Sequence, residues 1–120
     1  MTGWTSSDAW ILASVGNSRR GMTLSQLIGS ADAHNHAIPT RDELSQGLGS
    51  LLAAGLVEEV AGGFRTSSLG KELKKHWKSG MFRWAEALLP ELEKLDRIVE
   101  PYPLTDEEVH RAYIEYTRRH

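Results

Sequence analysis

Two histidines flank an asparagine in the segment ADAHNHAIPTRDEL, residues 31–44, and an aspartate stands just before them. Histidine and carboxylate side chains are common zinc ligands, so Asp32, His34 and His36 are candidates for a metal or nuclease site. The residues of the HNH nuclease motif are dispersed over a ββα unit, whereas these letters are contiguous. We interpret the histidines as a helix end and expect no metal or other cofactor, with a metal-dependent activity as the alternative.

The second group of chemically active residues is basic. The segment KELKKHWKSGMFR, residues 71–83, concentrates the positive charge of the chain. Its lysines recur at three- and four-residue steps and would share one flank of a helix: Lys71, Lys74, Lys75 and Lys78. Such a flank could contact nucleic-acid phosphates or an acidic partner, or be an ordinary solvated face.

The composition is that of one globular domain. The chain has 120 residues, 40% of them hydrophobic and 25% charged, a net charge of −2 and no cysteine. The first residues lack the features of a secretory signal, and no apolar stretch approaches the length of a membrane span. No phosphate-binding loop, nucleophile elbow or metalloprotease motif is present, so we expect a soluble, cytoplasmic protein that is not an enzyme.

The elements that must position these residues begin with three helices. The stretch 7–17 predicts a first helix capped by a serine, and the T-x-x-Q pattern at Thr23 begins a second. A third is expected to run from Arg41, after a capping box at Thr40, to Gly55. Its apolar residues have helical spacing: Leu44, Leu48, Leu51 and Leu52.

Beyond Gly55 the spacing of the apolar residues no longer follows the helical period. LVEEV and FRTS are short strand candidates around a glycine turn, and a helix capped by Ser67 or Ser68 follows. A further capping box at Thr105 predicts a last helix. The sequence therefore predicts a mainly α fold with a small β-hairpin, divided into a domain over 1–79 and a helical extension over 80–120.

The extension carries a heptad-like run. Steps of four and three residues separate its apolar positions: Met81, Ala85, Leu88, Leu92, Leu95 and Val99. We expect one helix, kinked at Pro90, that forms either a homodimer seam or an intramolecular hairpin. The aromatic residues Trp77, Phe82 and Trp84 could line an effector pocket or simply pack in the core.

The order of these elements is that of a winged helix-turn-helix. The stretch LLAAGLVEEVAGGFRTSSLGKEL, residues 51–73, resembles MarR-like and PadR-like bacterial regulators, and the resemblance covers about residues 8–76. The matching positions record packing and turns: Leu51, Leu52, Gly55, Leu56, Val57, Phe64, Thr66 and Gly70.

The resemblance implies a homodimeric transcriptional regulator that binds double-stranded DNA. Its second helix-turn-helix helix, beginning at Arg41, would enter the major groove. The solvent side of that helix would then carry Arg41, Asp42, Ser45, Gln46, Gly49 and Ser50. Among these, Arg41, Ser45, Gln46 and Ser50 would contact DNA, while Arg65 in the wing and Lys71, Lys74 and Lys75 would hold the backbone.

Four carboxylates depart from this pattern. Asp42 and Glu43 stand at the end of the helix that would face the groove, and Glu58 and Glu59 begin the wing. Carboxylates near phosphates repel them. The alternative is therefore a winged-helix protein-interaction module that does not bind DNA.

Overall fold

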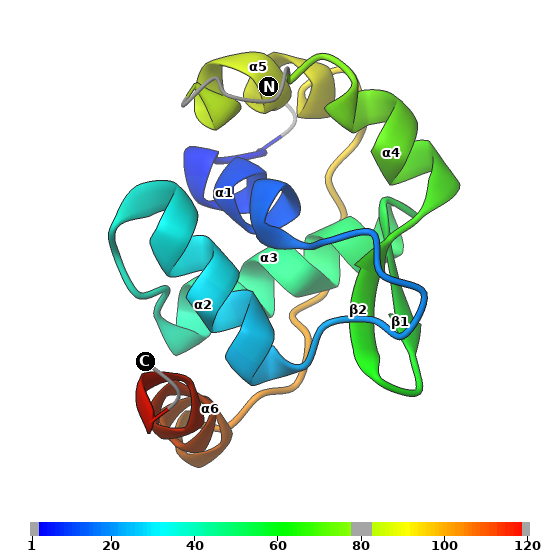
Figure 1. Ribbon diagram of the computed structural model, residues 1–120. Helices are drawn as coiled ribbons and strands as arrows, with labels where there is room; N and C mark the ends of the chain where they lie inside the picture. The colour runs from blue at the N-terminus through cyan, green and yellow to red at the C-terminus, as the bar shows by residue number, and fades with distance from the viewer. Residues whose placement is uncertain (1–2, 78–82, 119–120) are drawn as a thin grey trace.

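The computed structural model describes residues 3–77 and 83–118 and shows a mainly helical chain with a small antiparallel hairpin (Figure 1). This confirms the predicted fold class. The elements in chain order are α1 (Ser6–Ser14), α2 (Leu24–Asn35), α3 (Arg41–Ala53), β1 (Val57–Val60), β2 (Gly63–Thr66), α4 (Ser68–Lys74), α5 (Trp84–Leu92) and α6 (Asp106–Arg118).

Threonine caps begin the first three helices. The predicted capping boxes start α2 at Thr23 and α3 at Thr40. At α1 the predicted serine cap is wrong, because the cap is Thr5. Its hydroxyl accepts the Asp8 N–H at 3.2 Å, and the Asp8 carboxylate accepts the Thr5 N–H at 3.0 Å.

The exit of α3 leads directly into the hairpin, as predicted. Gly55 adopts φ +76°, the left-handed conformation that glycine tolerates best. The Leu56 N–H donates to the Leu51 carbonyl and the Gly55 N–H to the Leu52 carbonyl, both at 3.0 Å. These two bonds form a Schellman motif, which ends the helix and aims the chain into β1.

The hairpin is joined to the segment before α2. Its register pairs Val57 with Thr66 and Val60 with Gly63. Met22 extends it on the other side: the Met22 N–H donates to the Phe64 carbonyl at 2.6 Å, and the Phe64 N–H donates back at 2.8 Å. The sheet therefore continues into the chain between α1 and α2.

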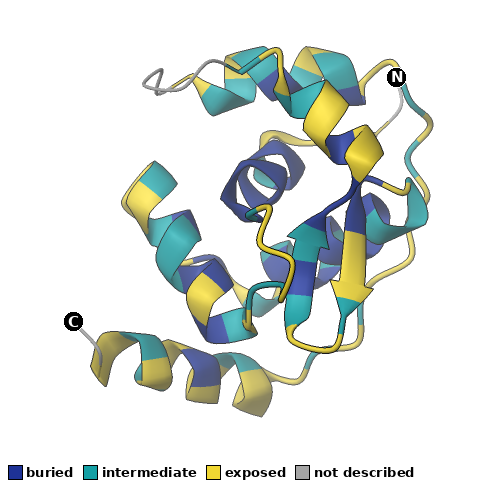
Figure 2. Cartoon of the chain, turned by 45° about the vertical axis from the view of Figure 1, so that its right-hand side comes forward, coloured by how far each residue is buried: buried dark blue, intermediate teal, exposed yellow. Residues whose placement is uncertain are grey.

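The core is centred on α1, which packs against α2, α3 and α5. Figure 2 shows α1 and α3 as the most deeply buried helices. The Trp10 indole donates to the Ala31 carbonyl at 2.9 Å and joins α1 to α2. The largest fully buried side chains include Ile11, Leu12, Leu27, Ile28, Leu44, Leu48, Leu51, Leu56, Leu88 and Leu92.

The predicted helix over the heptad run is wrong in its extent. α5 passes through Pro90 but ends at Leu92, and residues 96–105 are neither helix nor strand. Leu88 and Leu92 are fully buried in the core of their own chain, so they are not available as a seam between copies. Of the other seam positions, Ala85 and Leu95 are half-buried, Val99 is 64% exposed, and Met81 lies outside the described residues.

Both helices of the expected C-terminal extension pack on the rest of the chain, α5 on α1 and α6 on α2. The Trp84 indole donates to the His34 carbonyl at 3.2 Å, and the Trp77 ring lies 5.4 Å from the His34 ring. Both tryptophans are half-buried against the core, while Phe82 lies outside the described residues. No helix in the described ranges has the length and apolar character needed to cross a membrane.

Candidate nucleic-acid interface

The outer face of α3, opposite α1, is the surface that the resemblance would place against DNA. The expectation that Ser45, Gly49 and Ser50 are solvent-side positions is wrong. Ser45 is 5% exposed, Ser50 is fully buried and Gly49 is buried, whereas Gln46 is half-buried. In this conformation the two serines cannot reach a nucleic acid.

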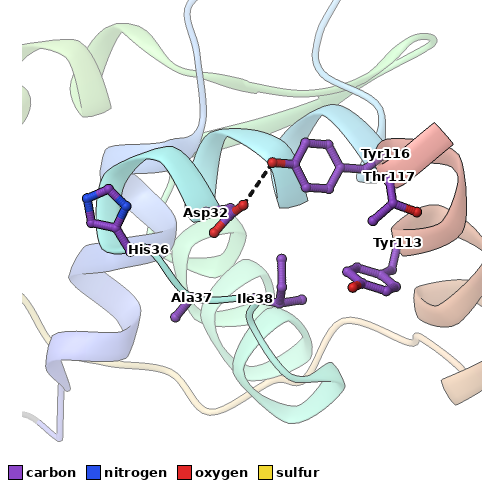
Figure 3. A pocket seen from close by; sticks show the side chains of 7 residues that line it. All are labelled: Asp32, His36, Ala37, Ile38, Tyr113, Tyr116 and Thr117. Atoms are coloured by element: carbon purple, nitrogen blue, oxygen red, sulfur yellow. Dashed lines mark hydrogen bonds between the residues drawn. The ribbon is translucent and has the colours of Figure 1, made fainter. Parts of the chain in front are cut away.

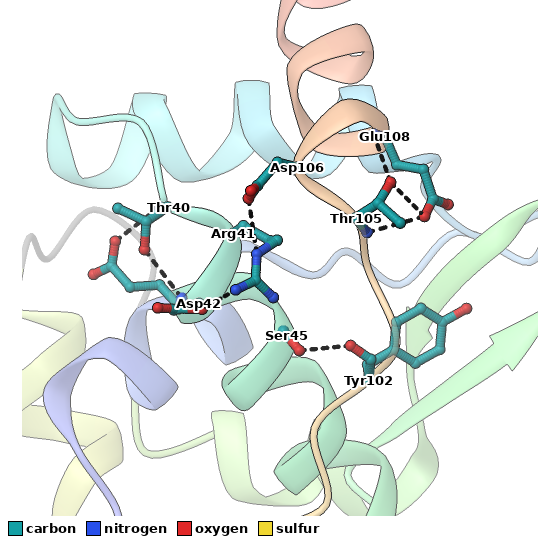
Figure 4. A network of polar contacts seen from close by, with 9 residues as sticks. Thr40, Arg41, Asp42, Ser45, Tyr102, Thr105, Asp106 and Glu108 are labelled. Atoms are coloured by element: carbon teal, nitrogen blue, oxygen red, sulfur yellow. Dashed lines mark hydrogen bonds and ion pairs between the residues drawn. The ribbon is translucent and has the colours of Figure 1, made fainter.

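Ser45 and Gly49 are covered by the segment 96–105, which we call the C-terminal strap. It runs along α3 on its way from α5 to α6 (Figures 1 and 4). The Ser45 hydroxyl donates to the Tyr102 carbonyl at 2.6 Å, and the Tyr102 N–H donates to the Ser45 carbonyl at 2.9 Å. At Gly49 the helix meets the strap backbone so closely that a methyl group would overlap the Glu100 carbonyl oxygen.

Arg41, the first residue of α3, is held by two carboxylates. Its Nε lies 2.8 Å from the Asp106 carboxylate, at the start of α6, and another guanidinium nitrogen lies 2.7 Å from the Asp42 carboxylate (Figure 4). An arginine fork binds carboxylate and phosphate with similar geometry. Asp106 therefore takes a position on Arg41 that a phosphate would need.

Tyr102 ties the strap to the hairpin as well. Its ring meets the Phe64 ring edge-on, with centroids 5.2 Å apart and planes at 81°. Its hydroxyl donates to the Glu59 carboxylate, and this hydrogen bond is the main cause that raises the pKa of Tyr102 to about 12. One strap residue thus links α3, β1 and β2.

Three arginines gather at the hairpin. Arg65 on β2 donates to the Glu58 carboxylate at 2.8 Å and to the Arg19 carbonyl at 3.0 Å. That second bond brings the loop carrying Arg19 and Arg20, both exposed, beside the strand. Sequence reasoning missed these two arginines, because contacts between residues distant in sequence place their loop at the hairpin.

The lysines of α4 do not share one solvent flank. Lys71 is exposed, and Lys75 is exposed and pairs with Glu72 at 2.9 Å. Lys74 turns inward, where its ammonium donates to the Val15 carbonyl at 2.7 Å, and burial lowers its pKa to about 8. In this conformation the Lys74 ammonium is held inside the protein and does not face solvent, while Lys78 lies outside the described residues.

The histidines end α2, as interpreted. His36 is the C-cap in the left-handed conformation, and its N–H donates to the Asp32 carbonyl at 2.7 Å. His34 Nδ1 lies 2.7 Å from the Ser30 carbonyl oxygen. Over residues 3–77 and 83–118, no three His, Asp or Glu side chains come together as a metal site.

The arrangement is thus a set of packed helices with a hairpin, in which the outer face of α3 is covered by a later segment of the same chain. No protein-family model matches the sequence, and comparison with curated proteins and with solved structures finds no match.

Proposed function

We propose that the chain is a cytoplasmic winged-helix transcriptional regulator whose DNA-reading helix, α3, is covered in a closed form by its own C-terminal strap and α6. The winged-helix assignment is supported by the order of the elements, the exit of α3 into the hairpin, and the Met22–Phe64 bridge. The observation that carries the proposal is the pairing of Arg41 with Asp106, in which an internal carboxylate occupies a phosphate-binding side chain.

The closed form is incompatible with reading of the major groove. A recognition helix contacts base edges through its N-terminal residues, and here the strap and the start of α6 lie against those residues. Release of the strap would expose the Ser45 hydroxyl, free Arg41 from Asp106 and uncover Gly49. Arg19, Arg20 and Arg65 would then supply contacts to the DNA backbone from the hairpin.

Gly49→Ala tests this proposal, because it should push the strap away from α3. Alanine stabilises a helix by about 1 kcal/mol relative to glycine, so α3 itself should persist. Its methyl group, however, would overlap the Glu100 carbonyl and displace the strap. We expect wild type to shift random duplex DNA weakly at about 50 mM salt, and Gly49→Ala to bind clearly more tightly, with an affinity that falls steeply as salt rises.

Two further variants make the result interpretable. Gly16→Ala is the matched control, because its methyl group would meet only the Met22 side chain, at ordinary contact distances from 3.6 Å, and it should behave as wild type. Adding Arg41→Gln to Gly49→Ala should weaken binding to the same random duplex and lower the slope of its salt dependence by about 1. A folded Gly49→Ala protein with a displaced strap and no DNA binding would contradict the proposal.

That outcome would favour the second candidate, a winged-helix interaction module that does not bind DNA. The fit of Gly49 and Ser45 to the strap supports it, because small side chains there serve packing within the chain. The exposed carboxylates Asp42, Glu58 and Glu59 support it too. The first proposal also includes the homodimer that the resemblance implies, formed without Leu88 and Leu92, which are buried within their own chain.

A further inference from the structure

A pocket of about 480 Å³ opens between the end of α2 and the last turns of α6 (Figure 3). Asp32, His36 and Ile38 line it from the side of α2, and Tyr113, Tyr116 and Thr117 line it from α6. The Tyr116 hydroxyl donates to one oxygen of the Asp32 carboxylate at 2.8 Å, so the two helices meet at the wall of the pocket.

The walls combine one negative charge with exposed aromatic and aliphatic surface. Ile38 is 38% exposed and Tyr113 is 37% exposed, which places both among the exposed large hydrophobic residues of the chain. In the described part of the chain, no lysine, arginine or histidine forms an ion pair with Asp32. Within residues 3–77 and 83–118, the carboxylate therefore faces the pocket with a phenol as its hydrogen-bond donor and without an ion-pair partner.

This chemistry selects a class of ligand. A tyrosine ring carries negative potential on its face and attracts an organic cation, and a nearby carboxylate adds to the attraction. A hard metal ion requires several oxygen ligands, whereas this pocket offers one carboxylate and neutral hydroxyls. An anion would be repelled by Asp32.

We propose that the pocket between α2 and α6 binds a small organic cation, an alkylated or quaternary ammonium group, with Asp32 as its counter-charge and Tyr113 and Tyr116 as its aromatic walls. The ammonium would lie against the rings, and its alkyl groups would cover Ile38. Neither the charge nor the rings alone would define the site, since the selectivity comes from having both.

The site has a consequence for the closed form. A ligand that touches both α2 and α6 stabilises the conformation in which these helices are together, by mass action. This consequence rests on the proposed function, because it makes the cation an effector that keeps α3 covered. Binding of the cation can be measured without DNA. The cation site and the proposed regulator function can therefore be disproved independently of each other.

The test is a chemical-shift titration of the full chain with choline and with 3,3-dimethylbutan-1-ol, which has the same shape without the charge. We expect saturable shifts for choline at residues 32–38 and 113–117, and at least about tenfold weaker binding of the neutral alcohol. Equal binding of both compounds, or no saturable shift with choline up to about 50 mM, overturns the proposal.

Substitutions on α2 and on α6 test whether choline binds between these two helices. Asp32→Asn keeps an acceptor for Tyr116 but removes the charge, and it should weaken choline binding at least about tenfold. Tyr113→Ala should weaken it while Tyr113→Phe, which keeps the ring, should not. Glu86→Gln, on the exposed surface of α5, is the control for loss of a carboxylate elsewhere. Unchanged binding in Asp32→Asn would also overturn the proposal.

Discussion

Lys74 shows how one residue of a basic cluster can have a structural role. Its ammonium donates to the Val15 carbonyl, just beyond α1, and lies 3.5 Å from the Thr66 hydroxyl. A cation near the C-terminus of a helix is favoured by the helix dipole. Neither contact supplies a negative charge, however, so desolvation dominates and the pKa of Lys74 falls from 10.5 to about 8.

This pKa predicts a specific dependence of stability on pH. Between about pH 8 and 10.5 the unfolded chain keeps the Lys74 proton while the folded chain has lost it. The unfolded state then binds more protons, so the contribution of Lys74 to the free energy of unfolding rises with pH, by on the order of 3 kcal/mol. Below pH 8 both states hold the proton and the contribution is constant.

Urea unfolding of wild type and Lys74→Met at intervals from pH 7 to 10.5 measures this contribution. Other groups that titrate in this range cancel in the difference between the two proteins, so the free-energy difference should change with pH in the direction that favours wild type at high pH. A difference that is constant over the whole range would show that the ammonium is not desolvated.

At the scale of the elements, local signals located most of the fold. The threonine caps at Thr23 and Thr40, the leucine spacing of α3 and the glycine at its end predicted two helices and the hairpin within a few residues. These features depend on contacts between residues close in sequence. They are therefore readable from the chain itself.

The cover on α3 was not predictable in the same way. Ser45 and Gly49 are the residue types expected on a solvated face, and they are also the types that allow a second backbone to approach. The contact joins residues more than 50 positions apart, and no local pattern encodes it. The one available signal was Gly49 itself, a glycine inside a helix, which lowers helix propensity and often marks a close contact.

The prediction of one long helix with a homodimer seam over 81–99 was wrong for a different reason. The heptad spacing correctly marked an apolar face at Leu88 and Leu92, but that face packs against α1 of the same chain. Spacing identifies which residues are buried and does not identify the partner that buries them. The same pattern fits a helix seam between two chains and a helix packed on its own domain.

Leu92→Ala separates these two arrangements. Removing a fully buried leucine should lower the free energy of unfolding by about 2–5 kcal/mol. Because Leu92 packs within its own chain, we expect the loss to be the same at all protein concentrations, as measured by chemical unfolding over a hundredfold dilution series. A loss that grows on dilution, with a shift toward monomer in sedimentation, would instead place Leu92 in an interface between copies.

For the molecule as a whole, burial separates a deeply buried core around α1 and α3 from a cover, by which we mean the strap and α6. α1 is buried at all but its first residues, whereas Ala112 is the buried residue of α6 in a helix of 13 residues (Figure 2). On α6, Tyr116 lies against Gly29 of α2, and its side chain lines two pockets. A helix with so little buried surface is expected to separate before the core unfolds.

Native-state hydrogen exchange tests this order of opening. Amides of 109–116 in α6 should exchange through an opening at least about 2 kcal/mol below that of α1 and α3. Gly29→Ala, whose methyl group would lie 2.8 Å from the Tyr116 ring, should lower protection in α6 further and leave α1 unchanged, while Gly16→Ala should alter neither. If α6 and α1 instead exchange with the same free energy, the cover is part of the cooperative core and α3 has no route to DNA short of global unfolding.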